Sequence, residues 1–123
     1  MNALSIARQA YSAASTPTRT PKDTEYEVLA RITHRLRTAA QRGAAGFPDL
    51  AAALHDNQRL WNIFASDVAD PGNELPGELR ARIFYLAEFT DLHTSQILAR
   101  KASVAALLEV NTAILRGLRH GAS

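Results

Sequence analysis

Residues 50–68 read LAAALHDNQRLWNIFASDV, and this stretch decides the fold. Its apolar side chains recur at alternating gaps of four and three residues, the spacing that places them on one face of an α-helix. The face consists of Leu50, Leu54, Asn57, Trp61, Phe64 and Val68. Asn57 is its one polar member, as in coiled-coil seams where a single buried Asn fixes the register. The stretch predicts a long amphipathic helix, opened by Pro48 and Asp49.

On the N-terminal side, residues 20–42 predict a second amphipathic helix. Thr20 suits the N-cap and Pro21 the first helical position, while the glycines of residues 43–46 end the helix. Its apolar line is Val28, Leu29, Ile32, Leu36, Ala39 and Ala40. Residues 2–15 predict a weaker N-terminal helix, which the Ser, Thr and Pro residues after it could detach from the body.

On the C-terminal side, Pro76 opens a helix of about 25 residues. Residues 83–87 of this helix are apolar on nearly every side, so we expect it to be the central element. Ser103 suits the N-cap of a last helix. Its stripe is Val104, Leu107, Leu108, Asn111, Ile114, Leu115 and Leu118. These patterns predict one all-α domain over residues 1–123, a small bundle of four main helices plus the weaker N-terminal helix.

Composition restricts the class of protein. The chain has 123 residues and no cysteine, so a disulfide framework is excluded. No apolar run approaches the roughly 20 residues of a membrane span, and no secretory signal is recognisable, so we expect a cytoplasmic protein without membrane insertion. The charges are uneven, with +4 over residues 1–47, −5 over residues 48–99 and +3 over residues 100–123.

No pattern in the sequence predicts catalysis. The chain has no nucleophile elbow, P-loop or dinucleotide-binding glycine motif. No two of its four histidines lie three or four residues apart, so helical spacing brings no pair of them to a metal. We therefore expect no catalytic residue, metal or cofactor, and no enzyme. Arg31, Arg35 and Arg42 share a helix face that could contact phosphates, but aromatic residues are not interleaved with them.

The segment Asn57-Gln58-Arg59-Leu60-Trp61-Asn62 is the sharpest local feature. Amides that both donate and accept hydrogen bonds lie there beside the only Trp, and Trp and Arg are favoured anchors of protein interfaces. The alternative is structural: Trp61 belongs to the core and Asn57 sets the helix register. Residue types alone favour this alternative slightly.

Several motifs together resemble the FlaF family of flagellar biosynthesis regulators from alphaproteobacteria. They are Ala10-Tyr11, Thr24-Glu25, Asn57-Gln58-Arg59-Leu60-Trp61, Leu75-Pro76, Glu78-Leu79-Arg80, Asn111, Ile114 and Gly117-Leu118. The resemblance covers nearly the whole chain except residues 16–23 and 99–103. It implies a non-enzymatic cytoplasmic protein, a chaperone or adaptor for flagellin production and export, acting alongside an FlbT-type regulator.

The resemblance also implies a partner, because flagellin ends in amphipathic helices whose apolar faces must be covered by a chaperone before export. We expect a groove between the third and fourth helices, binding a guest helix by its apolar face. The residues expected to bind the partner are Asn57, Gln58, Arg59, Trp61, Phe64, Tyr85 and Phe89. Two alternatives stay open: an RNA-binding regulator using the arginine face, which we favour less, and a homodimer using the third-helix seam.

Overall fold

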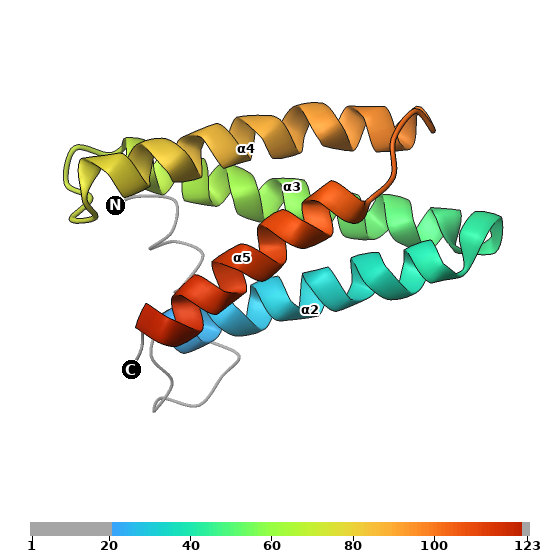
Figure 1. The fold of residues 1–123 in the computed structure, drawn as a ribbon, viewed down its shortest axis with the longest axis horizontal. Helices are drawn as coiled ribbons and strands as arrows, with labels where there is room; N and C mark the ends of the chain where they lie inside the picture. The colour runs from blue at the N-terminus through green and yellow to red at the C-terminus, as the bar shows by residue number, and fades with distance from the viewer. Residues whose placement is uncertain (1–20, 122–123) are drawn as a thin grey trace.

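The computed structural model describes residues 21–121, with side chains described for residues 24–117 (Figure 1). Its elements are α2 (Pro21–Gln41), the 3-10 helix η1 (Gly43–Gly46), α3 (Phe47–Ala69), α4 (Gly77–Leu98) and α5 (Ala105–Gly121). The prediction of an all-α bundle with four main helices is confirmed over this range. The predicted helix over residues 2–15 and the Thr20 N-cap lie outside the described residues. None of the described helices is long and apolar enough to cross a bilayer.

Helix α3 is the central element of the bundle. It lies between α2 and α4, and α5 crosses obliquely and packs mainly on α2, with only slight contact to α4 (Figure 1). The prediction that the fourth helix would be central is therefore wrong. Only α3 packs broadly against α4, so Phe84 and Tyr85, in the apolar run of residues 83–87, remain exposed.

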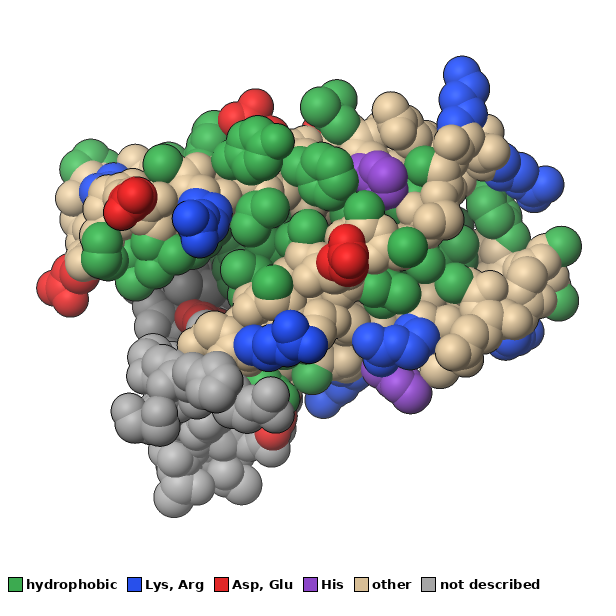
Figure 2. All heavy atoms as spheres, viewed as in Figure 1, with side chains coloured by type: hydrophobic (Ala, Val, Ile, Leu, Met, Phe, Trp, Pro, Cys, Tyr) green, Lys and Arg blue, Asp and Glu red, His purple; other side chains and the backbone are tan. Residues whose placement is uncertain are grey.

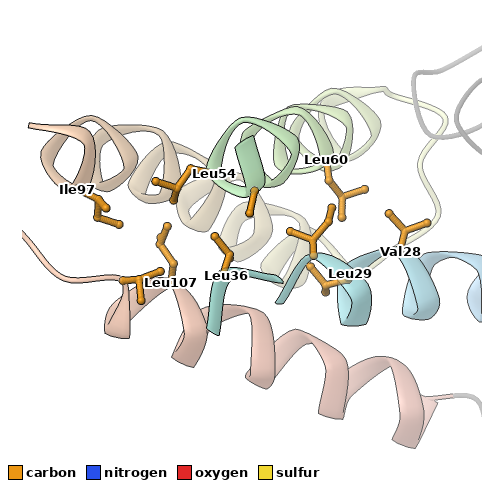
Figure 3. Close-up of a cluster of buried hydrophobic side chains, with 10 residues drawn as sticks. Val28, Leu29, Leu36, Leu54, Leu60, Ile97 and Leu107 are labelled. Atoms are coloured by element: carbon orange, nitrogen blue, oxygen red, sulfur yellow. The ribbon is translucent and has the colours of Figure 1, made fainter. Parts of the chain in front are cut away.

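The core forms where α2, α3 and α5 meet. Leu29, Leu36, Leu54 and Leu107 are fully buried, and Figure 3 shows them facing one another with Ile97 at one end of the cluster. Burying an aliphatic side chain of this kind stabilises the fold by about 1.5–3 kcal/mol. Both apolar faces predicted for α2 and α3 are confirmed, since their members are buried or half-buried.

Two glycines make the connection between α2 and α3. Gly43 has a φ of 62°, in the left-handed region that a side chain disfavours. At Gly46, an added Cβ would lie 2.2 Å from the Ala39 carbonyl oxygen, so the close approach requires glycine. The Arg42 guanidinium also donates to the Asp49 carboxylate over 2.5 Å, which joins the end of α2 to the start of α3.

Local hydrogen bonds end α4 and begin α5. The amides of Arg100 and Lys101 donate to the carbonyls of Ile97 and Gln96 over 2.9 and 2.8 Å, a Schellman motif with Arg100 at a φ of 61°. The Ser103 hydroxyl then accepts from the Ala105 amide over 3.3 Å. The predicted Ser103 cap is therefore confirmed. Helix α4 ends at Leu98, close to the predicted length.

Candidate functional site

Four buried polar side chains from three helices meet in the interior. The Trp61 indole Nε1 donates to Asn111 Oδ1 over 3.0 Å. Asn111 Nδ2 in turn donates to Asn57 Oδ1 over 2.9 Å and to the Thr33 hydroxyl over 3.1 Å. Because a buried polar group is costly unless it is paired, this network fixes the position of α5 against α2 and α3. The structural interpretation of Trp61 and Asn57 thus holds.

The prediction that Trp61 and Asn57 face a partner is wrong. Trp61 is 1% exposed and Asn57 is fully enclosed, because the seam of α3 is covered by the other helices of the same chain. Phe64 is half-buried and meets Trp61 edge to face, with ring centroids 5.4 Å apart. The same burial leaves this seam unavailable as the face of a homodimer.

The remaining predicted residues lie on two separate sides of the molecule. Gln58 donates to the Asp91 carboxylate and so joins α3 to α4. Arg59 is exposed, but it lines a cavity between α3 and α2. Only Tyr85 and Phe89 lie together on an accessible side of α4. The structure therefore places Tyr85 and Phe89 together on the surface of α4 and Trp61 and Phe64 together in the interior, and it places Arg59 at a separate cavity.

The accessible side of α4 carries a concentrated apolar surface. Among the described residues, all the large hydrophobic side chains that are exposed belong to residues 75–98: Leu75, Leu79, Phe84, Tyr85, Leu92 and Leu98. Tyr85 and Leu92 are 67% and 70% exposed, and half-buried Phe89 lies between them at gaps of four and three residues. We call Phe84, Tyr85, Phe89 and Leu92 the α4 apolar face. Figure 2 shows hydrophobic side chains over α4 and across the area between α4 and α5.

An open hollow adjoins this face where α3 ends and α4 begins. It has a volume of about 460 Å³. Val68 and Ala69 line it from α3, and Arg80, Phe84, Tyr85 and Glu88 line it from α4. The hollow shares Phe84 and Tyr85 with the α4 apolar face, and Arg80 and Glu88 add opposite charges to its lining.

A ring stack and a hydrogen bond hold Phe89 of α4 in place. The Phe89 ring stacks on the His93 ring, with centroids 5.2 Å apart. His93 Nε2 forms a 3.0 Å hydrogen bond with the Ser103 carbonyl oxygen, which ties this part of α4 to the start of α5. These two contacts fix the Phe89 ring within the α4 apolar face.

Two members of the α4 apolar face, Phe84 and Leu92, were not among the predicted contact residues. The signal for Leu92 was present, because Tyr85, Phe89 and Leu92 follow the same spacing that identified the α3 seam, whereas Phe84 directly precedes Tyr85 and lies outside this spacing. The sequence could not show which of the two stripes the chain itself would cover. No group of three or more His, Asp or Glu residues that could hold a metal ion occurs within residues 24–117.

Comparison with known proteins identifies the family of the chain. The family model described as "Flagellar protein FlaF" matches residues 7–118. No curated protein and no solved structure matches the chain significantly. The match covers most of the sequence, so the chain belongs to the FlaF family.

Proposed function

We propose that this FlaF-family protein binds an amphipathic terminal helix of flagellin on the α4 apolar face, as a cytoplasmic chaperone or adaptor for flagellin production and export. The single observation that carries the proposal is the confinement of the exposed large hydrophobic side chains, among the described residues, to residues 75–98. Scattered exposed hydrophobics are common, whereas a contiguous patch favours an interaction surface.

The spacing of the face supports a helical guest. A helix bound in a groove presents anchors at i, i+3 or i+4, and i+7, and Tyr85, Phe89 and Leu92 offer complementary contacts along the same length of helix. The hollow beside Phe84 adds room for a larger side chain of the guest. Burial of apolar area would drive the association, because apolar surface gains free energy when it leaves water.

The charge around the face supports a guest with basic flanks. Residues 48–99, which include α3 and α4, carry a net charge of −5. Glu88 and Asp91 lie beside the apolar side chains on α4, and both are exposed. Complementary charges raise the rate of association more than the affinity, so basic residues of the guest would speed its capture.

The test compares flagellin binding by two double variants that keep the core intact. Tyr85→Ser with Leu92→Ser removes two exposed anchors, and we expect about 100-fold weaker binding of flagellin or its isolated terminal segments, measured by calorimetry. The matched control, His34→Ser with Arg37→Ser, changes two exposed residues of α2 and should bind normally. Unchanged binding by the folded Tyr85/Leu92 variant would refute the assignment. Trp61 is unsuitable for this test, because its removal damages the core.

Salt dependence separates this proposal from RNA binding. Binding through apolar contacts should change little between about 50 and about 300 mM salt, whereas contacts to phosphates weaken steeply over this range. Tight, salt-sensitive binding to the flagellin messenger RNA with no binding to flagellin would therefore favour the RNA-binding alternative.

A further inference from the structure

We propose that a second surface, the arginine cavity between α2 and α3, binds a carboxylate-bearing segment of a partner protein through Arg31 and Arg59. The cavity has a volume of about 220 Å³. Four charged residues line it: Arg31 and Arg35 from α2, and Asp56 and Arg59 from α3. Val28, Ile32, Leu60 and Ile63 supply its apolar lining.

The charges in the cavity are not balanced internally. The Arg35 guanidinium pairs with the Asp56 carboxylate over 2.7 Å, which neutralises one of the three cations. Arg31 and Arg59 are exposed, and neither makes an ion pair with any residue that the structure describes. The cavity thus presents two unneutralised guanidinium groups beside a shared apolar wall. A planar guanidinium can donate two parallel hydrogen bonds to one carboxylate, so this arrangement suits a carboxylate ligand.

The lining favours an acidic protein segment over a nucleic acid. Nucleic-acid surfaces usually combine cations spread along a backbone path with aromatic side chains that stack on bases. Here the lining contains no aromatic residue, so the cavity offers no side chain on which a base could stack. A cavity of this size accommodates one or two side chains, such as a Glu or Asp with an aliphatic neighbour on the same helix face. The aliphatic neighbour would contact Val28 and Leu60.

The occupant must come from outside this chain's N-terminal segment. Residues 1–20 contain no Asp or Glu, so they cannot supply the carboxylate. The cavity also shares no lining residue with the α4 apolar face or with the hollow beside it. A partner in the arginine cavity could therefore bind at the same time as a guest on α4, and the two proposals stand or fall separately.

The test uses two synthetic helical peptides of about 18 residues, built from Ala and Leu with either Glu or Gln at every fourth position. Calorimetry on the full chain should show the Glu peptide binding at least about ten-fold more tightly than the Gln peptide. Arg31→Gln with Arg59→Gln should remove this preference. The matched control, Arg37→Gln with Arg82→Gln, changes two exposed arginines outside the cavity and should retain it.

Circular dichroism of both double variants should match that of the original chain, since none of the four arginines is buried. Equal binding of the two peptides, or an equal loss in both variants, would overturn the proposal. Tighter binding of an oligouridine RNA that depends on Arg31 and Arg59 would also overturn it, in favour of a phosphate ligand. A concentration-dependent dimer that only the Arg31/Arg59 variant lacks would overturn it in favour of a second copy of the chain.

Discussion

At the scale of single residues, the Asn111 side chain links α5 to both α2 and α3 through hydrogen bonds. It accepts from Trp61 on α3 and donates to Asn57 on α3 and Thr33 on α2. Asn57 is less well satisfied, because its Nδ2 atom has no hydrogen-bond partner among the described residues. The buried Thr90 hydroxyl oxygen on α4 is likewise unpaired there. The two asparagines therefore contribute unequally to stability, although both lie in helix stripes.

This inequality predicts a ranking of two substitutions. Asn111→Leu leaves the Trp61 indole N–H and the Asn57 oxygen buried without partners, so it should lower the free energy of unfolding by about 2–4 kcal/mol. Asn57→Leu removes an amide that is already half satisfied and leaves Asn111 bonded to Trp61 and Thr33, so it should cost less. Urea unfolding followed by circular dichroism measures both values. An Asn57 variant that is the less stable of the two would contradict the network described here.

At the scale of helices, patterns in the sequence were sufficient to locate the described helices. They were insufficient to predict which helices would pack against one another. The caps at Ser103 and the proline at Pro48 mark helix starts by local chemistry, which the chain carries within a few residues. The end of α4 carries no such mark, because Arg100 occupies the left-handed position where glycine is usual. Local rules therefore predicted where helices begin better than what each helix would contact.

The candidate site shows the same limit. The α3 seam and the stripe of Tyr85, Phe89 and Leu92 have the same spacing, yet the chain covers the first and leaves the second exposed. Which of two stripes is covered depends on long-range packing, and spacing alone carries no information about it. The family was recognisable from short motifs such as Asn57-Gln58-Arg59-Leu60-Trp61, because recognising a motif requires only the order of its residues and not which side chains are buried.

Arg80 is the clearest contact that stabilises a junction between helices. Its Nε donates to the Val68 carbonyl over 3.0 Å and its Nη2 to the Asp70 carbonyl over 3.4 Å, which places a cation at the negative end of α3. Arg80→Ala should therefore lower the free energy of unfolding by about 1–2 kcal/mol, measured by thermal or urea unfolding. Arg82→Ala, two residues away and exposed, serves as the control and should change stability little. Equal effects of the two changes would show that the capping contact is unimportant.

At the scale of the whole molecule, the bundle divides into a well-buried part and a peripheral helix. The buried large side chains belong mainly to α2, α3 and α5, whereas the buried residues of α4 are Ala87, Thr90, Thr94 and Ile97. Thr90, Thr94 and Ile97 lie in the second half of α4, and Ala87 is the last residue of its first half. The first half, which carries Phe84 and Tyr85 of the α4 apolar face, is therefore less buried than the second half.

Local stability should follow this division. Amides whose surroundings bury little apolar area open at lower free energy than amides in the core. We therefore expect hydrogen exchange to be faster over residues 79–86 of α4 than over residues 54–61 of α3. Adding the flagellin segment should slow exchange over residues 79–92 and leave the middle of α2 unchanged, because only α4 gains cover. Exchange over residues 79–86 of the free protein that is as slow as in α3 would contradict the predicted difference in local stability. Protection that appears on α2 instead of α4 would place the guest elsewhere on the molecule.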